Sequence, residues 1–239
     1  MTAVLDAMID LEEACERLED AQPREILTWA VERFFPRLTM ATAFGAEGCL
    51  LIDMLSRIEP HVRIFNLDTG YQFAETLELK ERIAARYGIN IELVRAGTTV
   101  EEYEAANGGP VYSRDPNQCC RDRKLVPLRR AIQGHDAWIS AIRADQSADR
   151  RRAKVVSWDA KFGLVKINPL LRWTKRDVWA YILTHEVPYN PLHDVGFPSI
   201  GCWPCTRAVA NGEDDDRAGR WAGQAKTECG LHSLDSSQL

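Results

Sequence analysis

Residues 38–70 read LTMATAFGAEGCLLIDMLSRIEPHVRIFNLDTG and hold two apolar segments bounded by turn residues. The first segment, 38–43, predicts a buried strand, and the glycine turn at 44–46 leads into a helical pattern at 47–58. A second strand is predicted at 62–67. A strand, a helix and a second strand at this spacing predict a βαβ unit and therefore a parallel sheet.

The flanking sequence extends this α/β pattern in both directions. Two N-terminal helices are predicted within 1–35, and a polar tail is predicted at 223–239. We therefore expect one domain at 1–222 with a mostly parallel, twisted sheet flanked by helices, followed by a flexible tail. The other predicted elements are a helix at 71–87, strands at 91–94 and 137–142, a strand or edge hairpin from 155–156 and 164–167, a helix at 174–185, a Pro- and Gly-rich loop from 187 and a short helix at 213–222.

Composition limits the classes of partner. The chain has 239 residues and a net charge of −5, so it lacks a nucleic-acid-binding footprint, and any anion site is a local basic patch. No apolar run approaches the roughly 20 residues that span a bilayer. The N-terminus is acidic and lacks the basic and apolar regions of a signal peptide. We therefore expect a cytoplasmic protein.

Two pairs of cysteines give the sharpest chemical signal. Cys119 and Cys120 are adjacent, and Cys202 and Cys205 form a Cys-x-x-Cys motif. Four thiolates bind zinc or an iron–sulfur cluster. Adjacent ligands favour the cluster because it offers several metal atoms in different places. The alternatives are zinc, or two unrelated pairs, one buried and one a redox dithiol.

The remaining cysteines and Lys124 have less specific surroundings. Lys124 follows Cys120 by four residues, so on a helix it would share the cysteine's face and offset the charge of a cluster; otherwise it belongs to a solvated basic face. Cys15 and Cys49 are expected in the core. Cys229 stands in a polar tail, as a nucleophile assisted by His232 or as a stray surface thiol. A covalent intermediate on it would need an external dithiol.

Several segments are candidate anion sites. The turn at 42–48 joins a strand to a helix, so its backbone N–H groups and the helix N-terminus would face a phosphate. The segments 68–70 and 143–152 also follow predicted strands, where ligands bind in α/β sheets. Arg217 and Arg220 are three residues apart, on one face of the predicted short helix. Solvated charged surfaces are the alternative for both basic segments.

Together, seven elements in order along residues 41–232 closely resemble the assimilatory adenosine phosphosulfate reductase family. One departure is that the family's first loop usually contains serines, whereas this loop has Ala43 and Gly48, which leaves Thr42 or backbone N–H groups for the phosphate. The elements are Ala43-Phe-Gly-Ala-Glu47, Asn66-Leu-Asp-Thr-Gly70, Cys119-Cys120, Arg143-x-Asp-Gln-Ser147, Gly201-Cys-x-x-Cys-Thr-Arg207, Arg217-x-x-Arg220 and Glu228-Cys-Gly-Leu-His232.

The resemblance implies an adenine nucleotide α-hydrolase-like fold and a complete set of site residues. It implies that Cys119, Cys120, Cys202 and Cys205 bind a [4Fe–4S] cluster that does not change redox state, and that Cys229 is catalytic. It is compatible with a homodimer or homotetramer. The implied substrate-binding residues are Thr42, Ala43, Phe44, Gly45, Ala46, Glu47, Leu67, Asp68, Thr69, Gly70, Lys124, Arg143, Arg217, Arg220 and His232.

The implied reaction is reduction of adenosine 5′-phosphosulfate to sulfite and AMP through an S-sulfocysteine, in sulfate assimilation and cysteine biosynthesis. Thioredoxin or a glutaredoxin-like dithiol would donate the electrons. One alternative is the 3′-phosphorylated nucleotide as substrate, alone or beside the first, although reductases for it generally lack the cluster cysteines. An ATP-using pyrophosphatase such as a tRNA thiolase would need a Ser-Gly-Gly-x-Asp-Ser loop, which this chain lacks. An iron–sulfur redox sensor is the non-enzymatic alternative and gives Cys229 no function.

Overall fold

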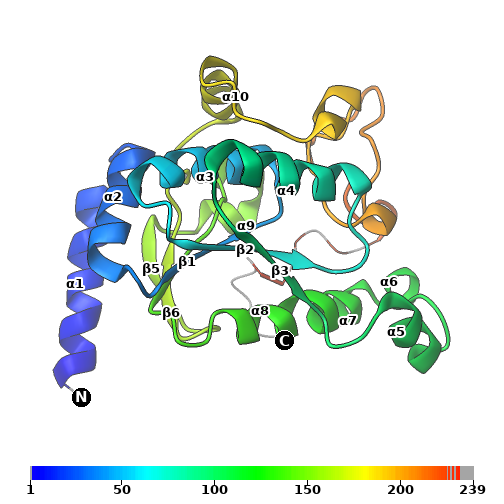
Figure 1. Cartoon of the computed structure of the whole chain (residues 1–239), viewed down its shortest axis with the longest axis horizontal. Helices are drawn as coiled ribbons and strands as arrows, with labels where there is room; N and C mark the ends of the chain where they lie inside the picture. The colour runs from blue at the N-terminus through cyan, green and yellow to red at the C-terminus, as the bar shows by residue number, and fades with distance from the viewer. Residues whose placement is uncertain (1, 225, 227, 229, 232–239) are drawn as a thin grey trace.

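The computed structural model describes residues 2–224, 226, 228, 230 and 231, and its centre is one six-stranded sheet (Figure 1). The strand order is β3-β2-β1-β4-β6-β5, with every pairing parallel except that of β5 with β6. The strands are β1 (Leu38–Thr42), β2 (Arg63–Asp68), β3 (Ile91–Arg95), β4 (Ala137–Ile139), β5 (Val156–Asp159) and β6 (Leu164–Ile167).

Helices cover both faces of the sheet (Figure 1). One face carries α2, α3 and α4, with α10 packed on α3, whereas α8 lies on the other face. The helices are α1 (Thr2–Leu18), α2 (Pro23–Phe34), α3 (Ala46–Ile58), α4 (Ala74–Tyr87), α5 (Val100–Asn107), α6 (Val111–Arg114), α7 (Pro116–Cys120), the π-helix η1 (Arg121–Leu125), α8 (Val126–Ala131), α9 (Ala148–Arg151) and α10 (Lys175–Thr184), with short 3₁₀ turns η2 (Ala144–Gln146), η3 (Pro191–Val195) and η4 (Trp203–Cys205).

The two faces of the sheet bury separate apolar clusters. The larger joins β1 and β4 to α2 and α3, and it contains Cys15 and Cys49, as expected. Complete burial raises the pKa of Cys49 to about 12, so this thiol stays protonated. The smaller cluster lies under α8 around Phe65 and Trp138, and Leu231 from the tail packs against it. The sheet is thus buried on both faces, as parallel sheets require.

The sequence predicted this architecture closely, with one wrong element. The α/β class, the parallel sheet and the edge hairpin are confirmed, and the capping box at Thr174 begins α10. The helix predicted at 213–222 is wrong, because this segment consists of turns and one bridge between Thr206 and Arg220. Gly219 allows that close pairing, since a Cβ there would lie 2.2 Å from the carbonyl oxygen of Arg207. None of the described helices is long and apolar enough to cross a membrane.

Candidate active site

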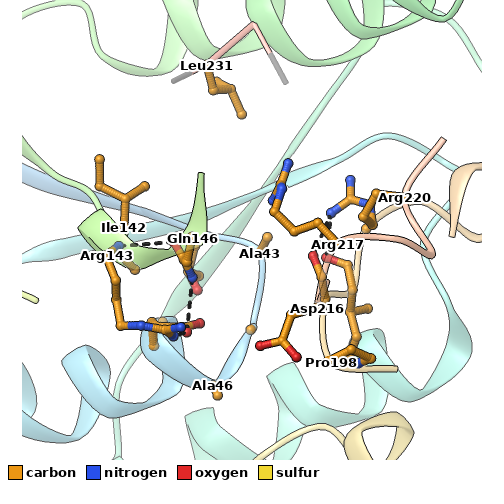
Figure 2. A pocket seen from close by; sticks show the side chains of 18 of the residues that line it. Ala43, Ala46, Ile142, Arg143, Gln146, Pro198, Asp216, Arg217, Arg220 and Leu231 are labelled. Carbon is orange, nitrogen blue, oxygen red and sulfur yellow. Dashed lines mark hydrogen bonds and ion pairs between the residues drawn. The ribbon is translucent and has the colours of Figure 1, made fainter. Parts of the chain in front are cut away.

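A cavity of about 510 Å³ opens where the strand order changes direction. The chain continues from β1 to β2 on one side, whereas β4 pairs with the other side of β1. Parallel α/β sheets bind ligands at such a switch point, beyond the carboxyl ends of the strands. The cavity is lined by residues that follow β1, β2 and β4, and by the segments 198–202 and 214–217 (Figure 2).

The loop between β1 and α3 forms one wall of the cavity. Thr42 Oγ1 accepts a hydrogen bond from the Phe44 N–H at 3.0 Å, which fixes the turn. Phe44 has a φ of 55° and is 1% exposed, so its ring anchors the loop in the core and does not line the cavity. Gly45 begins α3 without a side-chain cap. The first N–H groups of a helix have no intrahelical partner, so this wall suits an anion.

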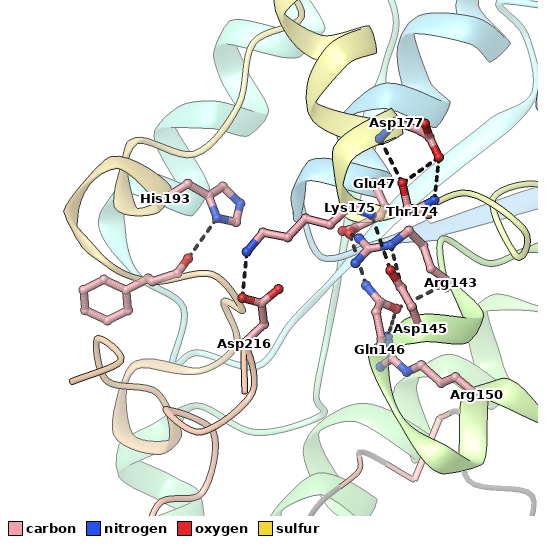
Figure 3. Close-up of polar contacts among 11 residues, drawn as sticks. Glu47, Arg143, Asp145, Gln146, Arg150, Thr174, Lys175, Asp177, His193 and Asp216 are labelled. Carbon is pink, nitrogen blue, oxygen red and sulfur yellow. Dashed lines mark hydrogen bonds and ion pairs between the residues drawn. The ribbon is translucent and has the colours of Figure 1, made fainter. Parts of the chain in front are cut away.

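Arg143 and Glu47 pair with each other in the cavity wall. The Arg143 guanidinium contacts the Glu47 carboxylate and donates from Nε to Asp145 Oδ1 at 2.9 Å. Gln146 Nε2 also donates to Glu47, at 3.1 Å (Figure 3). Arg143 is 5% exposed, so its charge is largely compensated where it stands. These contacts orient the Arg143 guanidinium in the cavity wall.

The opposite wall carries three cations that the sequence had singled out. Arg217 and Arg220 face Arg143 across the cavity, although they lie on turns and not on the predicted helix (Figure 2). Arg220 donates to Ser199 Oγ at 3.3 Å and lies over the Trp221 ring at 4.4 Å. Lys124 reaches the same cavity from η1. Cations of this kind bind phosphate or sulfate groups. They share the cavity with Asp214, Asp215 and Asp216, and with Glu228, which binds Arg217 at 3.1 Å.

The four predicted ligand cysteines line one small pocket beside this cavity. Cys119 and Cys120 end α7, where the chain passes into the π-helix η1, and Cys202 and Cys205 flank η4. The helix therefore changes geometry just beyond the adjacent pair, as two neighbouring ligands need. Burial, together with the charges of Cys202 and Cys205, raises the pKa of Cys119 to about 12, against the opposing effect of Lys124 and Arg123. Among the described residues, Cys119, Cys202 and Cys205 form no disulfide.

Lys124 joins the cysteine pocket to the large cavity, because it lines both. Thr69 does the same, and its Oγ1 lies 3.2 Å from Cys202 Sγ. Across the described ranges, no three Cys, His, Asp or Glu side chains form a group that would hold a metal ion. The four cysteines nevertheless line one shared pocket.

The predicted substrate residues divide into three groups. Most of them line the cavity. Phe44, Asp68 and Gly70 do not line it. Asp68 binds Arg95 at 2.9 Å and accepts a hydrogen bond from the Gly70 N–H at 3.0 Å, so Asp68 and Gly70 stabilise the loop after β2. Cys229 and His232 lie outside the described residues. The cavity-lining group is Thr42, Ala43, Gly45, Ala46, Glu47, Leu67, Thr69, Lys124, Arg143, Arg217 and Arg220.

Other cavity residues were missed by the sequence reasoning. Lys175, at the start of α10, reaches Asp216 at 2.6 Å (Figure 3). Arg150 binds Glu228 through two hydrogen bonds, although the sequence marked it only as part of a basic run. The available signal for Arg150 was its position in the connection after β4, four residues after Gln146, where α/β sheets bind ligands. Lys175 and Asp216 are 41 residues apart in the chain, and Arg150 and Glu228 are 78 apart, so no local sequence pattern reveals these ion pairs.

The parallel sheet, the loop before α3 and the cavity at the switch point define an adenine nucleotide α-hydrolase-like protein. Solved structures agree: an FMN adenylyltransferase of Candida glabrata aligns with a TM-score of 0.57 at 14% identity, covering 90% of this chain and 76% of that one, which shows the fold. The phosphoadenylyl-sulfate reductase of Candida auris, solved with phosphate, aligns with a TM-score of 0.73 at 31% identity, covering 83% of this chain and 96% of that one.

Sequence relatives identify the family. The phosphoadenosine phosphosulfate reductase domain model matches residues 37–208, and the chain belongs to this family. The phosphoadenosine 5′-phosphosulfate reductase of Gloeobacter violaceus is 47% identical over 93% of both chains. The adenosine 5′-phosphosulfate reductase 1 of Bacillus subtilis is 47% identical over 87% of this chain and 89% of the relative.

Proposed function

We propose that this protein reduces adenosine 5′-phosphosulfate to sulfite and AMP. The observation that carries the proposal is the grouping of Lys124, Arg217 and Arg220 in a cavity of about 510 Å³ that is also lined by the N-terminus of α3. Such a cavity accommodates a nucleotide whose phosphate and sulfate both need cations or N–H donors. Relatives at 40–47% identity carry this reductase name or that of the 3′-phosphorylated substrate.

The cavity walls have different roles in this proposal. The segment 42–48 and the α3 N-terminus hold the α-phosphate with backbone N–H groups, because Ala43 and Gly48 offer no hydroxyl. Leu67 and Thr69 border the adenosine. The Lys124 ammonium and the two arginines hold the sulfate, with His232 completing the set.

The proposed chemistry takes place on Cys229. Its thiolate attacks the sulfate sulfur, an S–S bond forms, and the bond from sulfur to the bridging phosphate oxygen breaks, so AMP leaves with the electron pair. The cations stabilise the charge on the leaving phosphate. A thioredoxin or glutaredoxin-like thiolate then attacks Cys229 Sγ and releases sulfite with its electron pair. The second thiol of the donor resolves the mixed disulfide, and the dithiol is oxidised.

We also propose a [4Fe–4S] cluster on Cys119, Cys120, Cys202 and Cys205. Four cysteines around one pocket match the donor set of such a cluster, and the adjacent pair at the end of α7 favours a group with several metal atoms over one zinc. When bound, the cluster would place a fixed charge beside Lys124. In the substitutions C119S and C202S, iron and acid-labile sulfide per protein should fall sharply, whereas the core substitution C15A should leave both unchanged.

The first test is sulfite formation by anaerobically purified protein with reduced thioredoxin, with each nucleotide offered separately. Strong preference for adenosine 5′-phosphosulfate supports the proposal, and equal or reversed preference moves the substrate to the 3′-phosphorylated nucleotide. Competition by AMP and by adenosine 3′,5′-bisphosphate gives the same distinction at the level of binding. If neither nucleotide yields sulfite although the cluster is intact, the proposed reductase activity is wrong.

The tail cysteine has its own test. C229S should abolish sulfite formation, because serine lacks the nucleophilic thiolate. AMP affinity and iron content should stay unchanged, because Cys229 is proposed to bind neither the nucleotide nor the cluster. Continued turnover by C229S would show that another group is the nucleophile. We further propose that the domain at 1–222 works in the cytoplasm, where reduced thioredoxin is available, with 223–239 as its tail.

A further inference from the structure

The carboxylate of Glu228 is buried among cations in the large cavity. Glu228 is 5% exposed and is the residue before Cys229. Its carboxylate accepts two hydrogen bonds from Arg150, from Nε at 2.9 Å and from Nη2 at 3.0 Å. Arg217 Nη2 donates a third at 3.1 Å, and Ser147 Oγ lies at 3.5 Å. A buried carboxylate held in this way is fixed in position, because releasing it would leave a cation without its partner.

The site that receives Glu228 is built by the segment after β4. Ser147 caps α9, and its Oγ accepts the Arg150 N–H at 3.2 Å. The Arg150 guanidinium also contacts Gln146, and the side chain is only 9% exposed (Figure 3). Arg150 is therefore oriented by its own neighbours in the chain as well as by Glu228. A pre-oriented, paired guanidinium binds a carboxylate with little loss of entropy.

The described residues beyond Glu228 are also held by the domain. Lys161 Nζ donates to the Gly230 carbonyl oxygen. A Cβ on Gly230 would lie 3.1 Å from Leu125 Cδ1, so the backbone passes close over η1. Leu231 packs against the apolar cluster under α8. Glu228, Gly230 and Leu231 thus all contact the domain, and the Glu228 carboxylate makes the most strongly charged of these contacts.

Arg217 connects this docking to the ligand. Its guanidinium lines the cavity beside Arg220, yet one of its nitrogens donates to Glu228. A substrate anion at Arg217 therefore shares that cation with the tail carboxylate. Arg217 therefore contacts Glu228 and lies where it would also contact a bound anion.

We propose that Glu228, paired with Arg150, is a positioning residue that docks the tail and holds Cys229 for attack on the bound substrate. The inference rests on the proposed function for the chemistry but not for the docking. Glu228 does not touch the reacting atoms; it acts through the residue that follows it.

The test compares E228Q with E213Q. Glu213 is a matched control, since it also accepts two hydrogen bonds from one arginine, Arg207 at 2.8 and 2.7 Å, but on the exposed surface. In single turnover, E228Q should form the Cys229 S-sulfonate about 10- to 100-fold more slowly than wild type, as misplacement of a reacting group does. AMP affinity should be retained, because the tail carboxylate is not a ligand of the nucleotide. E213Q should match wild type.

A second readout follows docking without any chemistry on the nucleotide. Iodoacetamide should alkylate the tail peptide faster in E228Q than in wild type when no nucleotide is present. The charge-exchanged double variant R150E/E228R should recover part of the wild-type protection, which a merely unfolded tail would not.

The outcomes separate the two proposals. S-sulfonation by E228Q at the wild-type rate overturns the positioning role, and so does a slowing fully explained by lost AMP affinity. If the wild type forms no S-sulfonate from either nucleotide, the proposed function fails. The alkylation rates still decide on docking in that case, and equal rates in E228Q and wild type would refute it.

Discussion

The guanidinium of Arg220 fills the space that a side chain at position 201 would occupy. A Cβ on Gly201 would lie 2.3 Å from Arg220 Nη2 and 2.6 Å from Cζ. The same guanidinium donates to Ser199 and stacks over Trp221, which aims it along the cavity wall. The absence of a side chain at Gly201, the residue before the Cys202–Cys205 motif, therefore allows the Arg220 guanidinium to occupy this position.

The substitution G201A should displace Arg220 without unfolding the protein, because the clashing atoms lie at the end of a flexible side chain. Loss of one charge-assisted hydrogen bond should weaken nucleotide binding about tenfold. Adenosine 5′-phosphosulfate affinity measured by calorimetry in a C229S background, where no turnover occurs, tests this. G97A is the control, since a Cβ there meets nothing within 4 Å. Equal affinities in the two variants would mean that Arg220 does not contact the ligand.

Gly48 provides a second prediction, about the loop before α3. A Cβ at this position would lie 2.6 Å from Thr42 Oγ1, the atom that holds the turn at Phe44. G48A should destabilise the fold by about 1 kcal/mol, as overpacking outweighs the gain in helix propensity. In a T42A background the clash is gone, so the same substitution should cost less. Urea unfolding of the four proteins gives the coupling energy, and simple additivity would contradict the contact.

Local patterns explain why the sheet and helices were predictable. Residues 38–70 alternate apolar segments with turns, so their secondary structure follows from neighbours in the chain. The cysteine pairs and the basic residues were likewise recognisable as motifs. Their mutual placement was not, because the pocket that joins Cys119 to Cys202 depends on how α7 and η4 pack.

The error at 213–222 has the same origin. Arg217 and Arg220 were the correct side chains, but their spacing suggested a helix that the chain does not form. The bridge between Thr206 and Arg220 uses the backbone instead, and it depends on Gly219 lying against Arg207. Similarly, the sequence did not reveal that Glu47, which lines the cavity, pairs with Arg143, 96 residues away. Such long-range pairings have no local signature.

Tyr181 stabilises the domain away from the cavity. Its hydroxyl donates to Asp53 Oδ2 at 2.7 Å, and Asp53 is fully buried. Y181F should lower the free energy of unfolding by about 1–2 kcal/mol, because a buried carboxylate loses a donor. Y189F is the matched control, since that hydroxyl binds the exposed Asp194 and its loss should be nearly neutral. Thermal unfolding measures both, and equal effects would show that burial of Asp53 adds nothing.

Lys166 makes stability depend on pH in a defined window. Burial, together with the charges of Arg150 and Lys161, lowers the pKa of Lys166 to about 8 against the opposing charge of Asp159. An unfolded lysine keeps its proton up to a pKa of about 10.4, so below pH 8 the folded state holds a charge that it disfavours. Between pH 8 and 10 the unfolded chain binds more protons than the folded one, so the free energy of unfolding rises with pH through this group.

The substitution K166M removes the titrating group. The free energy of unfolding of K166M minus that of wild type should therefore be largest below pH 8 and shrink as the pH rises to 10. Urea titrations of both proteins across this range cancel the tyrosine and cysteine contributions that they share. A difference independent of pH would show that the Lys166 pKa is the same in the folded and unfolded states.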